Sequence, residues 1–318
     1  MDERGLLDLI IARFDELSFR EKITLCESFG TEQELVQCSV SDIEAVIGRR
    51  LAGYRGIDTI RALAEQDAAA VRLKGINWVC WASAAYPPLL REIFDPPPLL
   101  FYRGILPNPE MPLVAIVGTR KPSRQAMSQA FDIAQGLARG GISVVSGLAL
   151  GIDAMAHRGN IEGGAPTVAV MGAGLDGVYP LSNRNLARRV LETGGALVSE
   201  YPPGIGPRKW NFPARNRIIS GLSRGVVIVE APEKSGALIT ARFALEHNRE
   251  LWVASSGAGQ EAAPFDRRGT ARLAAEGAEV IQSASEILKA WNMEADPEET
   301  GGLTLASSLA HSLGVHNY

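Results

Sequence analysis

Two short apolar runs, each ending in a glycine-bearing turn, most strongly constrain how this chain can fold. The runs extend from Val114 to Gly118 and from Ile142 to Gly147, and each is followed by a helix-like stretch. Two successive strand-turn-helix units predict half of a doubly wound sheet. The turns of such a sheet lie together at the carboxyl ends of its strands, where backbone N–H groups and helix N-termini attract anions. We therefore expect a phosphate-bearing ligand at that edge.

Apolar runs alternate with helix-like stretches through most of the chain. They read VAIVG, ISVVSG, TVAVMG, ALVSE, GVVIVEA and ELWVAS, and the runs INWVCW and LLFYRG add two strand candidates before them. This alternation predicts an α/β fold in which a mostly parallel sheet carries helices on both faces. We assign residues 76–291 to one extended Rossmann-like domain.

Residues 1–75 differ in character and predict a small all-helical domain. Capping boxes of the form Ser/Thr-x-x-Glu mark three helix starts: Ser18 with Glu21, Thr31 with Glu34, and Ser41 with Glu44. The domain is either a DNA- or protein-contact module or a scaffolding appendage, and the absence of a basic cluster favours the appendage. We expect residues 292–318, an acidic and polar stretch, to be a loose tail too short for a further domain.

Composition narrows the class of protein. The 318 residues are 46% hydrophobic and 21% charged, as in an ordinary soluble globular protein. A net charge of -4 argues against a polycation that coats nucleic acid, but it leaves local basic patches open. No apolar stretch is long enough to span a membrane, and the N-terminus lacks a signal-peptide pattern. The three cysteines are too widely spaced for a CxxC pair, so we expect reduced thiols and a cytoplasmic protein.

The turn after the first strand carries candidate phosphate-binding residues. It consists of Gly118, Thr119, Arg120 and Lys121. Glycine permits a tight bend that turns the following N–H groups outward, and an arginine can bind a phosphate bidentately. The alternative is an ordinary strand-to-helix turn with solvated basic side chains.

The second turn adds a polar pair to this edge of the sheet. It contains Ser146, Gly147, Gly151, Asp153 and His157. Asp153 and His157 are four residues apart, so on a helix they share a face and could hydrogen-bond to one another. They could orient a ligand, or they could be only a helix N-terminal carboxylate and its local partner. A metal site is not indicated, because no third ligand lies nearby.

Segment 201–229 concentrates positive charge in an otherwise acidic chain. It contains no Asp or Glu, and its basic residues are Arg208, Lys209, Arg215, Arg217 and Arg224. Trp210 and Phe212 lie among them, and cations combined with aromatic rings bind single-stranded nucleic acid. The alternative is a solvated loop whose two rings pack against the sheet. Farther along, Ser235 and Gly236 open another predicted helix whose N-terminus can bind an anion or be capped by the serine.

The glycine pattern at Gly172, Gly174 and Gly177 resembles a dinucleotide fingerprint only superficially. In that fingerprint the third glycine opens a helix, whereas here Val178, Tyr179 and Pro180 follow and the helix begins near Ser182 or Asn183. A Walker A loop and a GxSxG motif are also absent. The sequence therefore shows no motif for ATP hydrolysis and none for a serine hydrolase.

Six segments in order resemble the DprA (Smf) family of DNA-processing proteins. They read IVGTR, SGLALGIDAMAH, VAVMGAGLDGVYP, LVSEYPPG, FPARNRIISGLS and VVIVEAPEKSGALITARFA, within residues 76–254. The resemblance implies an extended Rossmann-like domain that binds single-stranded DNA, forms a homodimer and loads the RecA recombinase during natural transformation and recombination. It implies neither catalysis nor a cofactor. The N-terminal helices resemble the sterile-alpha-motif-like domain of many members.

The resemblance also assigns site residues. The first turn corresponds to the family's Gly-Ser-Arg turn with Thr119 in place of serine, and the second turn to its SGxAxGID..AH block. Arg215, Asn216 and Arg217 match its RNR block. Leu181 departs from a position that is often basic in the family, although Arg184 lies close by, and residues 255–278 also diverge. We do not expect the C-terminal winged helix of other members, because the tail is short.

Two enzyme classes remain as alternatives. A nucleotide phosphoribohydrolase of the Lonely-guy type also binds phosphate at glycine turns of a Rossmann-like sheet. However, its PGGxGTxxE signature is absent, and the segment SGALITA lacks the catalytic glutamate at that spacing. An NAD-linked enzyme is the second alternative, which a change in cofactor fluorescence would reveal.

Overall fold

A nine-stranded sheet forms the centre of the structure, a computed structural model that describes residues 5–258 and 265–293. The strand order is β1-β2-β6-β5-β4-β3-β7-β8-β9. Neighbours from β6 to β9 are parallel, whereas β2 is antiparallel to both β1 and β6. The strands are β1 (Asn77–Cys80), β2 (Leu99–Gly104), β3 (Leu113–Val117), β4 (Ser143–Ser146), β5 (Val168–Val170), β6 (Ala196–Ser199), β7 (Gly225–Ile228), β8 (Glu250–Ala254) and β9 (Glu279–Ile281).

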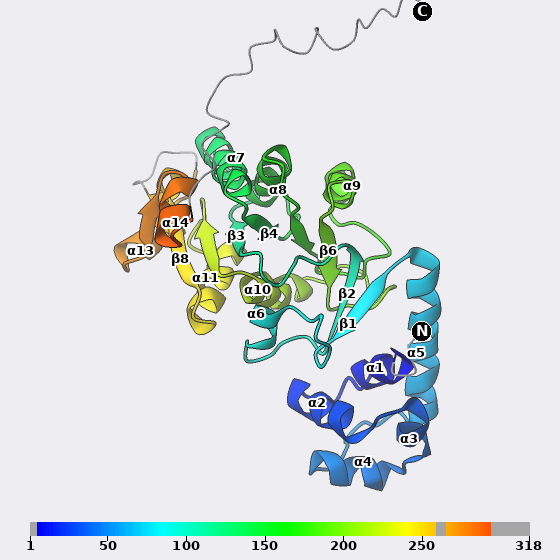
Figure 1. Cartoon of the computed structure of the whole chain (residues 1–318). Helices are drawn as coiled ribbons and strands as arrows, with labels where there is room; N and C mark the ends of the chain where they lie inside the picture. The colour runs from blue at the N-terminus through cyan, green and yellow to red at the C-terminus, as the bar shows by residue number, and fades with distance from the viewer. Residues whose placement is uncertain (1–4, 259–264, 294–318) are drawn as a thin grey trace, which may run out of the picture.

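Helices cover both faces of this sheet (Figure 1). Helices α7, α8 and α14 pack on the face to which Val114 and Ile116 of β3 point, and α10, α11 and α13 pack on the face of Ala115 and Val117. The helices of this part are α6 (Pro88–Arg91), α7 (Arg124–Arg139), α8 (Ile152–Glu162), α9 (Arg184–Glu192), α10 (Asn211–Leu222), α11 (Gly236–Glu246), α12 (Ser255–Ala258), α13 (Arg268–Ala275) and α14 (Ala284–Ala290). The predicted α/β fold class is confirmed.

The inner strands are buried along their whole length, which explains why the sequence shows continuous apolar runs. Every residue of β3, β4, β5, β6 and β7 is buried. A strand covered by helices on both faces has no solvent-facing side, so its sequence does not alternate between apolar and polar residues. The divergent segment 255–278 contributes α12 and α13, with residues 259–264 outside the described part.

An all-helical region precedes the sheet, as predicted (Figure 1). Its helices are α1 (Gly5–Ala12), α2 (Phe19–Ser28), α3 (Glu32–Gln37), α4 (Val40–Ile47) and α5 (Ile57–Lys74). The helical region contacts the loop after β1, where the rings of Phe19 and Trp81 lie 5.8 Å apart and Arg20 stacks on Phe94. None of the helices within residues 5–258 and 265–293 is long and apolar enough to cross a membrane. The predicted loose tail lies almost entirely outside the described residues.

Two of the three predicted capping boxes are confirmed, at Ser18 and Thr31. The third was wrong. Helix α4 is capped by Ser39 with Asp42, so Ser41 lies inside the helix, and Glu44 accepts a hydrogen bond from the Leu51 N–H. An aspartate closes this box, and a pattern restricted to glutamate placed the helix start two residues too late.

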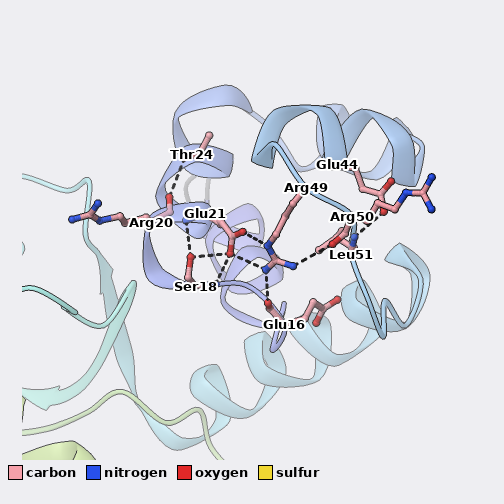
Figure 2. Close-up of polar contacts among 9 residues, drawn as sticks. All are labelled: Glu16, Ser18, Arg20, Glu21, Thr24, Glu44, Arg49, Arg50 and Leu51. Atoms are coloured by element: carbon pink, nitrogen blue, oxygen red, sulfur yellow. Dashed lines mark hydrogen bonds and ion pairs between the residues drawn. The ribbon is translucent and has the colours of Figure 1, made fainter.

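The capping carboxylate of α2 also ties this helix to the segment after α4. Arg49 donates to Glu21 Oε2 at 3.0 Å and to the Glu16 carbonyl at 2.9 Å, as Figure 2 shows. The hydrogen bond from Arg49 lowers the pKa of Glu21 to about 2. One glutamate therefore starts a helix and joins two parts of the helical region.

Candidate nucleic-acid interface

A basic groove lies at the carboxyl ends of the central strands, where the strand order reverses. The chain runs from β3 to β4 on one side and returns to β7 on the other side of β3. Ligands of open α/β sheets bind at such a switch point. The groove has a volume of about 700 Å³, and its lining includes five cations: Arg120, Lys121, Lys209, Arg215 and Lys234.

The first turn presents Arg120 and Lys121 to solvent. The Thr119 N–H donates to the Glu230 carbonyl at 2.7 Å, which ties the turn to the end of β7. A Cβ at Gly118 would lie 2.6 Å from a carbon of Ile152, so only glycine fits between the turn and α8. Beyond this tight point Arg120 and Lys121 are exposed, and neither forms an ion pair with a described residue.

The second turn is held from two sides. The Asp153 carboxylate accepts hydrogen bonds from the N–H groups of Gly147 at 3.1 Å and Ala149 at 3.4 Å. The Asn183 side-chain amide donates to the carbonyls of Leu148 at 2.9 Å and Ala149 at 3.2 Å. Leu148 has a φ of 55°, a conformation that non-glycine residues adopt only when their surroundings enforce it. These hydrogen bonds therefore fix the conformation of the turn without a bound ligand.

Arg215 lies buried beneath this turn. Its Nη1 donates to the carbonyls of Gly147, at 2.8 Å, and Val170. A Cβ at Gly147 would lie 2.3 Å from that nitrogen, so glycine makes room for the guanidinium group. Burial lowers the pKa of Arg215 to about 10, while the negative charge of Asp153 opposes the shift. Arg215 therefore stays charged at neutral pH and fixes the floor of the groove.

Asp153 and His157 do not hydrogen-bond to each other, contrary to one possibility raised by their spacing. Asp153 points to the second turn, whereas the His157 ring packs inside and contacts the Thr167 hydroxyl at 2.8 Å. That hydroxyl donates to the Val144 carbonyl, so it accepts the Nδ1 proton of His157. Ser146 is likewise buried, and its hydroxyl donates to the Ile116 carbonyl at 2.6 Å. Ser146 and His157 therefore support the groove from inside.

The RNR block points in three directions. Arg215 faces the floor, and the Asn216 amide donates to the Gly236 carbonyl at 3.0 Å, which joins α10 to the start of α11. Arg217 turns away and binds Glu200 at 2.7 Å, with Asp95 at 3.4 Å. Arg217 is not among the residues that line the groove. Its charge is balanced within the protein.

The remaining predicted residues lie at two helix starts. Ser235 caps α11, with its hydroxyl accepting from the Ala237 N–H at 3.2 Å, and both Ser235 and Gly236 line the groove. Arg184 opens α9, is exposed, and lies outside the groove lining. Sequence reasoning missed Lys234, which lines the groove directly before Ser235. The sequence signal that could have found Lys234 is its position in the loop between another parallel strand, β7, and the helix that follows it.

Aromatic side chains accompany the cations. Phe212 is half-buried in the groove, its ring 5.5 Å from that of Tyr179, and the Arg120 guanidinium group lies 5.7 Å from the Phe212 ring. Trp210 is 67% exposed and does not pack against the sheet, contrary to the alternative for this segment. Unpaired bases could stack on such rings.

The glycine pattern of residues 172–177 serves packing. A Cβ at Gly174 would lie 2.5 Å from the Pro202 carbonyl, and one at Gly172 would lie 3.0 Å from the Phe212 ring. No helix starts at Gly177, since a 3₁₀ turn over Leu181–Asn183 precedes α9. The context of a dinucleotide site is therefore absent. Within residues 5–258 and 265–293, no cluster of three or more His, Cys, Asp or Glu side chains could hold a metal ion.

The mostly parallel sheet and the basic groove at its switch point define an extended Rossmann-like protein with an anion-attracting edge. The family model of DNA recombination-mediator protein A matches residues 77–292. The chain therefore belongs to that family.

Known relatives agree with this assignment. Protein Smf of Synechocystis is 47% identical over 208 residues, which cover 64% of this chain and 51% of that protein, so the match spans about half of its length. DNA processing protein DprA of Bacillus subtilis is 40% identical over 227 residues, covering 70% of this chain and 73% of the relative.

Two solved structures are similar over most of their length. The X-ray structure of DNA processing protein A from Streptococcus pneumoniae matches with a TM-score of 0.72 and 31% identity, covering 91% of this chain and 98% of that one. DNA processing protein A from Helicobacter pylori, described by its single-stranded DNA binding mode, matches with a TM-score of 0.59 and 28% identity. The match covers 68% of this chain and 95% of that one.

Gly147→Ala should destabilise the fold, because the added methyl group would displace the Arg215 guanidinium group from its two carbonyl acceptors. Overpacking of this kind costs about 2 kcal/mol, which denaturant unfolding would measure. Gly177→Ala is the control, since a Cβ there meets no atom within 4 Å. Equal stability of the two variants would contradict the role assigned to Gly147.

His157 should make stability fall in mild acid. Burial, aided by the charge of Arg215, lowers the pKa of His157 from 6.5 to about 3. Between these values the unfolded chain binds a proton that the folded protein excludes, so folding stability decreases as pH falls. Between pH 8 and pH 5 the titration of His157 should lower the free energy of unfolding by about 2 kcal/mol.

Denaturant unfolding of the wild type and His157→Asn at both pH values measures this contribution. The substitution removes the titrating ring, so the variant should lose about 2 kcal/mol less than the wild type on acidification. Identical losses would show that His157 does not titrate differently in the two states.

Proposed function

We propose that this chain binds single-stranded DNA in its basic groove, without catalysing a reaction on it. The observation that carries the proposal is the set of exposed cations around the groove, Arg120, Lys121, Lys209 and Lys234, which form no ion pairs with described residues. Cations left unpaired in this way are available to neutralise the phosphates of a nucleic-acid backbone.

The aromatic residues favour a single strand as the ligand. Phe212 and Tyr179 line the groove with the cations, and the exposed Trp210 directly follows the groove residue Lys209 in the chain. Only unpaired bases can splay out and stack on aromatic side chains. The Helicobacter pylori relative, described as binding single-stranded DNA, is consistent with this ligand.

Membership of the DNA recombination-mediator family supports a wider role. We propose that the chain loads the RecA recombinase on the bound strand during natural transformation and DNA recombination. We further propose that it acts in the cytoplasm as a homodimer formed through the Rossmann-like domain. These steps rest on the family resemblance and on the DNA-binding proposal.

The residues that line the groove argue against the alternative function, that of a nucleotide phosphoribohydrolase. Among its lining residues within the described part of the chain, Asp153 is the one carboxylate. Asp153 is buried, its oxygen accepts two backbone hydrogen bonds, and burial raises its pKa. These properties suit a structural support for the turn better than an acid or base that meets substrate.

Arg120→Ala should weaken single-stranded DNA binding for every base sequence, because the arginine would contact phosphate. The slope of log K against log salt should fall by about 1, as expected for one lost phosphate contact. Fluorescence anisotropy of labelled oligonucleotides of several sequences over a salt series would measure both quantities.

Arg72→Ala is the matched control for this experiment, because Arg72 is exposed on α5, far along the chain from the groove. Its affinity and salt slope should equal those of the wild type. An unchanged slope for Arg120→Ala would remove Arg120 from the binding surface.

A further inference from the structure

We propose that an exposed apolar rim, formed by Leu150, Tyr179 and Leu181, contacts unpaired bases and makes the groove select single-stranded over duplex DNA. The inference rests on the proposed DNA-binding function and names a specificity determinant of that same groove. The fractional exposure is 45% for Leu150, 44% for Tyr179 and 76% for Leu181. Large apolar side chains exposed together beside a ligand groove indicate a contact surface.

The rim is fixed in place by the rest of the site. Asn183, two residues after Leu181, donates to the carbonyls of Leu148 and Ala149 and so joins the Leu181 segment to the Leu150 turn. Tyr179 packs on Phe212, and Leu150 and Tyr179 enclose a small recess with Arg120 and Arg215. A rigid apolar surface loses little conformational entropy when a ligand covers it.

Sheet order places the rim beside the cations. The strands β5, β4, β3 and β7 are consecutive neighbours, and each contributes the loop at its carboxyl end. The loops after β5 and β4 carry the three apolar residues, whereas those after β3 and β7 carry Arg120, Lys121 and Lys234. Neighbouring strands are about 4.8 Å apart, so about 15 Å separates the ends of β5 and β7. The three apolar residues lie toward the β5 end of this edge, and three of the five groove cations lie toward the β7 end.

A single strand matches this division. Its phosphates can follow the basic side while its bases turn toward the apolar side, where burial of their faces releases water. In a duplex the base faces are stacked inside, so phosphates and base edges remain accessible but the faces do not. The rim therefore adds affinity for single strands alone. Because apolar burial releases no counterions, this added affinity should not depend on salt.

The test compares the wild type with Leu150→Ser and Leu181→Ser. Anisotropy titrations use a labelled single-stranded oligonucleotide and a duplex of the same length over a salt series. Each substitution should weaken single-strand binding by about three- to tenfold at every salt concentration, leaving the salt slope and duplex affinity unchanged. Leu181→Lys should instead steepen the salt slope by about 1 and strengthen binding to both forms of DNA at low salt.

Leu73→Ser is the control, since Leu73 is 82% exposed on α5 and takes no part in the groove. Wild-type affinities for single strands in the rim variants, or equal losses for single strand and duplex, would overturn the proposal. Conversion of a dimer to a monomer by either rim substitution, measured by sedimentation, would show that a second copy covers the rim and would also overturn it. Absence of DNA binding by the wild type would contradict the proposed function itself.

Discussion

The buried guanidinium group of Arg215 is the interaction on which the shape of the candidate site depends. It joins α10 to the turn after β4 and to the end of β5, through the carbonyls of Gly147 and Val170. A buried charge is tolerated only when it is paired and hydrogen-bonded, and Asp153 supplies the opposite charge. Because Asp153 also accepts the Gly147 N–H, the ion and its counter-charge hold the same turn from two directions.

This arrangement separates charges that build the groove from charges that remain available to a ligand. Arg215 and Arg217 are used internally, the first by backbone carbonyls and the second by Glu200. Arg120, Lys121, Lys209 and Lys234 stay exposed and form no ion pair with any residue that the structure describes. Cations carried on turns that are already hydrogen-bonded in place can bind a polyanion without rearrangement of the backbone. The rigid turns and the exposed cations together therefore support a role in nucleic-acid binding.

The sequence predicted much of the fold because burial of the inner strands forces continuous apolar runs, and strand-helix alternation then implies a mostly parallel sheet. It also predicted which turns meet at one edge. Sequence patterns did not reveal the directions of side chains, which depend on tertiary packing. The spacing of Asp153 and His157 suggested a hydrogen-bonded pair, but Asp153 binds the second turn and His157 binds Thr167. The charge pattern also did not reveal that Glu200 neutralises Arg217. Ser41 failed as a cap because Ser39 and Asp42 form a competing box.

We propose above all that this groove binds a single DNA strand through its phosphates and unpaired bases. The most direct test is competition anisotropy, in which a labelled single-stranded oligonucleotide bound to the protein is displaced by unlabelled single strand or by duplex of equal length over a salt series. The unlabelled single strand should compete better than the duplex at every salt concentration, and its affinity should fall steeply with salt. No binding, or equal and weak competition by both forms, would contradict it.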